Sequence, residues 1–153
     1  MYKRQNERNG EISPDGRWLA YSSAETGRHE IYVRPYPNLE ERRWQISVDG
    51  GVQPAFSRRG DELFFLGREG RMMVSQIRTS GEFSASAPRT ILEPQRYALE
   101  SAVNAIVTAR TYDISPDGRR FLMIESAEAP INAGGIVVVL NWADELKRVL
   151  PVR

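Results

Sequence analysis

One short turn pattern occurs three times along the chain and sets the length of its structural unit. Residues 11–18 read EISPDGRW, residues 113–121 read DISPDGRRF, and residues 57–60 read SRRG at the equivalent place. When Ser13, Ser57 and Ser115 are aligned, the steps between them are 44 and 58 residues. Repeat proteins built from small β-sheets have units of about 40–50 residues, so the second step contains an insertion.

Short apolar runs follow each turn and alternate as half-buried strands do. The second and third runs of each unit occupy residues 18–23 and 30–36, 62–67 and 71–77, and 120–126 and 135–141. The first two units add a fourth run, at residues 43–48 and 89–94. Strands of about 4–8 residues that are separated by turns predict an all-β chain. We expect a partial β-propeller of about three four-stranded antiparallel blades, at about residues 10–48, 51–94 and 109–141.

Two segments depart from this pattern. Residues 95–108 fill the long second step and are compatible with either a helix or a loop. Near the end, Trp142, Leu146 and Val149 recur at helical spacing, between a capping Asn141 and the helix-ending Pro151. We therefore predict a short C-terminal helix at residues 142–149.

The aspartates of the repeated pattern are interpreted as turn formers. In such turns proline presets the backbone, aspartate accepts hydrogen bonds from nearby N–H groups, and glycine supplies a positive φ. The middle unit has Arg59 where the other two have aspartate, which suits a turn better than a catalytic group. The predicted turn residues are Ser13, Pro14, Asp15, Gly16, Ser57, Gly60, Ser115, Pro116, Asp117 and Gly118.

The composition excludes several kinds of site. The absence of cysteine excludes disulfides, thiolate zinc sites and a cysteine nucleophile. The only histidine, His29, follows a turn glycine and is expected in an exposed loop; it cannot by itself make a catalytic triad or a two-histidine metal site. A net charge of +1 gives no case for nucleic acid or an anionic membrane as a partner. We assign no catalytic, cofactor-binding or metal-ligating residue and expect no cofactor.

The arginine pairs at positions 42–43, 58–59 and 119–120 lie at turns and strand starts. They are interpreted as a solvated rim, and a rim that binds anions is the alternative.

The repeated pattern also resembles a known family. SPDG followed by an apolar run resembles the TolB-type, WD-repeat-like β-propellers of bacteria. Over about residues 6–151, and most specifically at VVVLNWADELKR (137–148), the chain is similar to the C-terminal propeller of bacterial membrane-anchored serine/threonine protein kinases. This resemblance implies a kinase domain and a membrane helix upstream, with the propeller on the extracytoplasmic or periplasmic side. The kinase glycine-rich loop, His-Arg-Asp and Asp-Phe-Gly motifs do not occur in the sequence, so kinase activity is carried over to no residue.

Two features predict that the chain is part of a longer protein. Residues 1–5, MYKRQ, resemble a translated sequencing adapter, so we expect a non-native leader before a truncated metagenomic gene. A closed propeller of this kind needs roughly six blades, about twice the number found here. If the chain is expressed alone, we expect it to form a homodimer that completes a ring, or to aggregate.

Three functions remain open. The preferred one is a non-catalytic propeller segment for ligand sensing or protein–protein interaction, from the C-terminal region of a serine/threonine kinase. The alternatives are a free-standing periplasmic TolB-like binding protein and, less favoured, the gating propeller of a prolyl-oligopeptidase-like serine peptidase. The innermost strands of a propeller line its central channel. The candidate channel-lining residues for an unidentified protein or small-molecule ligand are therefore Glu11, Gln53 and Tyr112.

Overall fold

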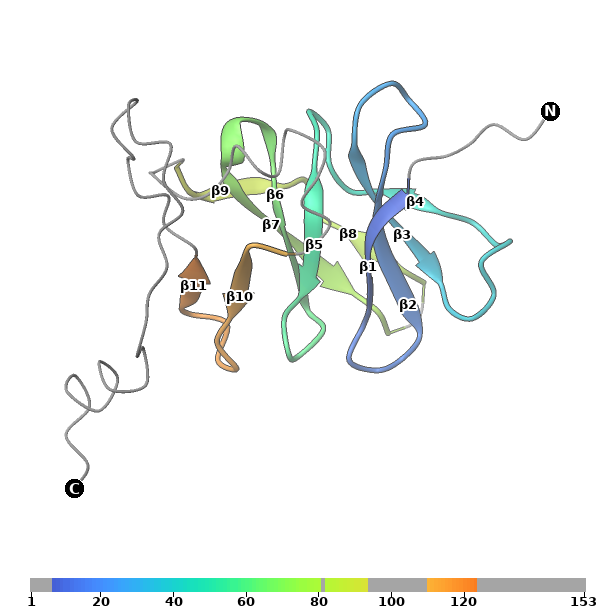
Figure 1. Cartoon of the computed structure of the whole chain (residues 1–153). Helices are drawn as coiled ribbons and strands as arrows, with labels where there is room; N and C mark the ends of the chain where they lie inside the picture. Colours follow the sequence, from blue (N-terminus) through green and yellow to red (C-terminus); the bar gives the residue numbers. More distant parts are fainter. Residues whose placement is uncertain (1–6, 81, 94–109, 124–153) are drawn as a thin grey trace, which may run out of the picture.

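The computed structural model describes residues 7–80, 82–93 and 110–123, and this part of the chain is all-β with antiparallel sheets (Figure 1). Within it, the only helical segment is a short 3-10 turn at Arg68–Gly70. The prediction of an all-β fold with antiparallel sheets is therefore confirmed for the described residues. The expected leader at residues 1–5, the segment at 95–108 and the C-terminal helix at 142–149 lie outside the described residues.

The strands of the described part form three sheets. The first sheet contains, in order, β1 (Glu7–Ile12), β2 (Trp18–Ser23), β3 (Glu30–Pro35) and β4 (Trp44–Gln45). The second contains β5 (Val52–Phe56), β6 (Glu62–Leu66), β7 (Met72–Arg78) and β8 (Ser84–Ala85), with β9 (Arg89–Leu92) also paired to β7. The third contains β10 (Tyr112–Ile114) and β11 (Phe121–Met123). The sequence did not predict β8, because two residues carry no periodic signal.

The first hairpin of each sheet has the same pairing register. The residue two positions before the turn serine always lies opposite the residue seven positions after it. These pairs are Glu11 with Ala20, Ala55 with Phe64, and Asp113 with Leu122. The three hairpins therefore share one pairing register, and residues can be compared between them position by position.

A bulge recurs at one place in the first strands of the first two sheets. The pairing register shifts between Arg8 and Glu11 in β1, and between Val52 and Ala55 in β5. Asn9 and Gln53, at this bulge, both have left-handed backbones, with φ of 52° and 56°. Each lies four residues before its turn serine, so the repeat extends to an uncommon backbone conformation.

The first and third turns share one hydrogen-bonded geometry. Ser13 Oγ accepts a hydrogen bond from the Trp18 N–H (3.0 Å) and donates one to the Asp15 carboxylate. Asp15 also accepts from the Arg17 N–H (3.2 Å). Gly16, with φ of 72°, donates its N–H to the Ser13 carbonyl (2.8 Å). In the third turn the same bonds are made by Ser115, Asp117, Gly118, Arg119 and Arg120.

The middle turn keeps a carboxylate, although its sequence SRRG lacks the aspartate of the other two. Ser57 Oγ donates to Asp61 Oδ1 (2.8 Å) and accepts from the Glu62 N–H (3.1 Å). Gly60, with φ of 73°, donates its N–H to the Ser57 carbonyl (2.9 Å). The turn therefore forms with Arg59 at the position of the other two aspartates, but it still contains a carboxylate that accepts from the serine hydroxyl. Asp61, one residue after the glycine, supplies the carboxylate that the serine hydroxyl needs.

The three sheets pack face to face in series, with the second in the middle (Figure 1). Successive side chains of a strand point to opposite faces, and β6 shows this directly. Leu63 and Phe65 pack toward the first sheet, whereas Phe64 and Leu66 pack toward the third, and all four are at most 2% exposed. The first-sheet partners are Trp18, Ala20, Ile31 and Val33, and the third-sheet partners are Tyr112, Ile114, Phe121 and Met123.

The turn aspartates predict how stability falls in acid. Burial acts to raise the pKa of Asp15, but hydrogen bonds from Ser13 and the Arg17 N–H outweigh it and lower the pKa overall. The hydrogen bond from Ser115 is the main cause of the lowered pKa of Asp117. A carboxylate whose pKa is lower in the folded than in the unfolded chain stabilises the fold above the unfolded pKa of about 4. That contribution is lost as the pH falls through the folded pKa.

We expect the double variant Asp15→Asn, Asp117→Asn to lose less stability than the wild type when the pH falls from about 5 to about 2. Urea unfolding at a series of pH values measures the free energy of unfolding in each case. Parallel pH profiles for the two proteins would show that these carboxylates do not contribute.

Candidate functional site

The first strands β1, β5 and β10 lie side by side and carry the three candidate channel-lining residues (Figure 1). Glu11 is on β1, Gln53 on β5 and Tyr112 on β10. The shared pairing register explains this convergence, since each residue lies two to four positions before its turn serine.

Gln53 and Tyr112 join the second sheet to the third. The Tyr112 hydroxyl donates to the backbone carbonyl of Gln53 (2.6 Å), and the side-chain oxygen of Gln53 accepts from the N–H (2.9 Å) and hydroxyl (3.1 Å) of Thr111. Gln53 is 1% exposed and Tyr112 is 4% exposed. Burial raises the pKa of Tyr112, so the phenol stays protonated and remains a hydrogen-bond donor. These two side chains therefore hold β10 against β5 instead of facing solvent.

Glu11 and Arg110 connect all three sheets through one ion pair. One carboxylate oxygen of Glu11 accepts from the Phe56 N–H (3.0 Å), and the other pairs with Arg110 Nη1. Arg110 Nε donates to the Tyr112 carbonyl (3.1 Å), and its Nη2 lies 3.5 Å from Asp113 Oδ1. The guanidinium also lies 5.8 Å from the centre of the Tyr112 ring, within the range of a cation–π contact.

A cavity of about 350 Å³ opens beside this ion pair. Its charged lining residues are Glu11, Arg110 and Asp113, together with Arg58 from the turn between β5 and β6. Arg58 is exposed, and no described residue forms a hydrogen bond or ion pair with its guanidinium. Two guanidinium and two carboxylate groups, beside apolar residues such as Ile12, Phe56 and Ile114, suit the binding of a small polar or zwitterionic group.

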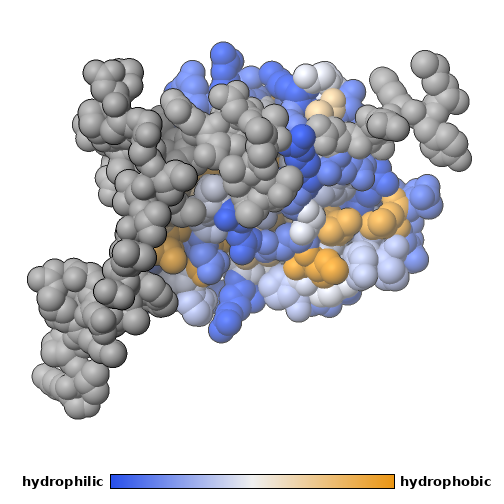
Figure 2. Space-filling view, viewed as in Figure 1, coloured by the Kyte–Doolittle hydropathy of each residue, from blue (hydrophilic) through white to orange (hydrophobic). Residues whose placement is uncertain are grey.

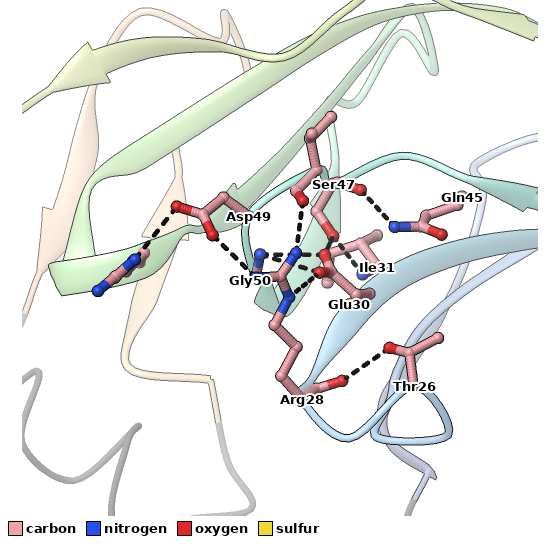
Figure 3. Close-up of polar contacts among 10 residues, drawn as sticks. Thr26, Arg28, Glu30, Ile31, Gln45, Ser47, Asp49 and Gly50 are labelled. Atoms are coloured by element: carbon pink, nitrogen blue, oxygen red, sulfur yellow. Dashed lines mark hydrogen bonds and ion pairs between the residues drawn. The ribbon is translucent and has the colours of Figure 1, made fainter.

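A second polar cluster fixes the far end of the first sheet (Figure 3). The Glu30 side chain is 1% exposed and accepts from Arg28 Nε (2.5 Å), from the Ser47 hydroxyl and from the Gly50 N–H (3.1 Å). Ser47 Oγ in turn accepts from the Ile31 N–H (2.7 Å). The contacts of Glu30 and Ile31 with Ser47 and Gly50 join β3 to the segment that leads into β5. The buried carboxylate therefore fixes the chain where it leaves the first sheet.

The second sheet carries the same ion pair with its charges exchanged. Ile31 and Met72 are equivalent, because they pair with Ser22 and Leu66, nine residues after their turn serines. Glu69 and Arg71 therefore stand at the positions of Arg28 and Glu30, and their side chains lie 2.9 Å apart. The Glu69 and Arg71 side chains are 57% and 40% exposed. An ion pair therefore occupies this position in both sheets, but its acidic member is buried only in the first sheet.

His29 lies in the loop before β3, as expected, but it is half-buried instead of exposed. The connection between β4 and β5 folds back onto it, and the Gly51 N–H donates to the His29 carbonyl (2.8 Å). Its Nδ1 is buried without a hydrogen-bond partner among the described residues. Burial and then the positive charge of Arg8 lower the pKa of His29, which keeps the imidazole neutral at pH 7.

Sequence reasoning missed the residues that hold these clusters together. Arg110 left only one weak signal, an isolated basic residue five positions before a turn serine. Arg28 and Glu30 are close in sequence, but Ser47 lies 17 residues after Glu30 and reaches it only because the segment after β3 folds back onto this strand.

In the part of the chain that the structure describes, no three His, Asp or Glu side chains gather in a way that could hold a metal ion. No helix there is long and apolar enough to cross a bilayer. A comparison with protein-family models and with curated proteins finds no match for this chain.

Proposed function

We propose that the chain is a non-catalytic segment of a β-propeller that serves ligand sensing or protein–protein interaction. Serial face-to-face packing of sheets, with the first strands adjacent, supports this reading because the first strands line the central channel of propellers. The resemblance of the SPDG turns and of VVVLNWADELKR supports a parent protein of the serine/threonine kinase class, with this segment in its extracytoplasmic C-terminal region.

The cavity beside Glu11 and Arg110 carries the functional part of the proposal. Its charged groups are Glu11 on β1, Asp113 on β10, Arg110 just before β10 and Arg58 in the turn after β5. Arginine stays protonated at all ordinary pH values and binds anionic groups through several N–H donors, so it recognises ligands well and transfers protons poorly. Arg58 is the member of this lining with unused hydrogen-bonding capacity, and a ligand carboxylate would be its natural partner.

A thermal-shift screen of amino acids, dicarboxylates and short peptides tests this site. A bound ligand at about 100 times its Kd stabilises a protein by about 2.7 kcal/mol, which is measurable as an increase in Tm. We expect Arg58→Ala to weaken such binding about tenfold or more, because a charge-assisted hydrogen bond is lost. The matched control is Arg59→Ala, since the neighbouring arginine does not line this cavity. Equal losses in both variants would contradict the proposed site.

The parent protein is tested by sequencing the genomic DNA around this reading frame. A kinase domain upstream in the same frame supports the proposal. A signal peptide directly upstream would favour the free-standing periplasmic binding protein instead. A downstream segment with a Gly-x-Ser-x-Gly nucleophile elbow would favour the peptidase.

A further inference from the structure

Apolar side chains are exposed on the outer face of the first sheet. The equivalent side chains of the second sheet are buried, because the first sheet packs on them. The shared register makes Ile12 equivalent to Phe56, and Tyr36 equivalent to Ile77. Phe56 and Ile77 are 7% and 6% exposed because the first sheet packs on them. Ile12 and Tyr36 are 45% and 41% exposed. Figure 2 shows apolar patches at the right of the view, where the first sheet lies.

The same face contains a hollow. A cavity of about 260 Å³ is lined by Leu19, Tyr21, Arg34 and Leu39, among others. Arg34 stacks on the Tyr21 ring at 5.6 Å and donates to its hydroxyl (2.7 Å), which holds one wall in place. This hollow is large enough for an aliphatic side chain.

The outer face of the third sheet presents such a side chain. Leu122 is 75% exposed, whereas its equivalents Ala20 and Phe64 are 0% and 2% exposed under the next sheet. Inside the chain, Phe64 packs edge-on against Phe121 of the third sheet, with ring centres 5.2 Å apart. Phe121 is equivalent to Leu19, because both lie six positions after their turn serines. The internal contact of Phe64 with Phe121 therefore predicts a contact of Leu122 with Leu19 across an interface.

We propose that a second copy of this chain docks on the outer face of the first sheet, with Leu122 of that copy inserted against Leu19 and Tyr21. The reciprocal contact closes two copies into one ring, and the three described sheets of each copy give six in total. Six lies within the four to eight sheets from which propellers are built. Two identical interfaces related by a two-fold axis satisfy closed symmetry. This inference rests on the proposed propeller architecture, and it identifies a second copy of the chain as the partner that completes the ring.

Light scattering coupled to size-exclusion chromatography tests the dimer at micromolar concentration. We expect twice the chain mass for the wild type, and a monomer for Leu19→Arg and for Leu122→Glu. The matched control is Val48→Glu, which changes an apolar side chain that is 69% exposed and lies in the connection between β4 and β5. It should remain a dimer. A monomeric wild type, or a Leu122→Glu variant that still dimerises, overturns the proposal.

Cross-linking tests the pairing of the two faces, because the chain contains no cysteine of its own. In a mixture of Leu19→Cys and Leu122→Cys chains, a short bismaleimide should link one variant to the other. Each variant alone should give no cross-linked dimer, since equal faces do not meet in the ring. Links within the single-variant samples overturn this arrangement.

The test of the dimer and the test of the proposed ligand site can fail independently of each other. The cavity at Arg58 and Arg110 lies within one chain. A monomer that still binds a ligand through Arg58 would remove the dimer and leave the proposed function standing.

Discussion

The Glu30→Ala variant is expected to unfold with a free energy about 2–5 kcal/mol smaller than that of the wild type, because two buried hydrogen-bond donors lose their acceptor. The carboxylate of Glu30 is 1% exposed and accepts hydrogen bonds from Arg28, Ser47 and Gly50. Its removal leaves the Ser47 hydroxyl and the Gly50 N–H without their acceptor, and such buried donors are costly. Urea unfolding followed by tryptophan fluorescence measures the difference.

The second sheet provides the matched control for this variant. Arg71 occupies the position of Glu30 but is 40% exposed, and its pairs with Glu69 and Glu93 are solvated. Exposed ion pairs of this kind contribute about 1 kcal/mol or less. We therefore expect Arg71→Ala to lower the free energy of unfolding by about 1 kcal/mol at most. If the two variants lose similar amounts, burial of the Glu30 cluster is not what holds the exit of the first sheet.

The second large effect is expected from Phe65→Ala, which should cost about 3–5 kcal/mol of folding free energy. Phe65 is 1% exposed and lies in the core between the first and second sheets. Truncation removes the ring and leaves a cavity that β6 cannot close, because its opposite face is packed against the third sheet.

Val48→Ala is the control for this core substitution, since Val48 is apolar but 69% exposed. Its loss should stay within about 0.5 kcal/mol. The same urea titration applies to both proteins. A small effect of Phe65→Ala would mean that the first two sheets do not pack on each other as described.

Much of the fold could be predicted because its signals are local. A turn serine followed by a positive-φ glycine marks each hairpin, and ELFFLG alternates between two buried faces. These signals depend on one strand and one turn at a time. They are sufficient to predict the all-β class and the equivalence of the three turns, because neither depends on a tertiary contact.

The rest depends on contacts between distant residues. Asp61 replaces the missing turn aspartate from the other side of Gly60, a shift that sequence alignment of the turns does not show. Arg110 and Glu11 are 99 residues apart in sequence, and they form their ion pair only because β1 and β10 approach each other. The innermost position of the first strands predicts that Gln53 and Tyr112 line a channel, whereas in the structure both side chains are buried between the second and third sheets.

The cavity beside Glu11 and Arg110, the polar contacts of Arg110 and the two outer faces all depend on the serial packing of the three sheets. Nuclear Overhauser effects between aromatic rings measure this packing directly. The Trp18 and Phe83 ring centres lie 4.7 Å apart between the first and second sheets, and the Phe64 and Phe121 centres lie 5.2 Å apart between the second and third. We expect cross-peaks for both pairs, which are lost selectively in Phe83→Leu and Phe121→Leu. A folded chain that lacks either cross-peak would contradict the stacked arrangement.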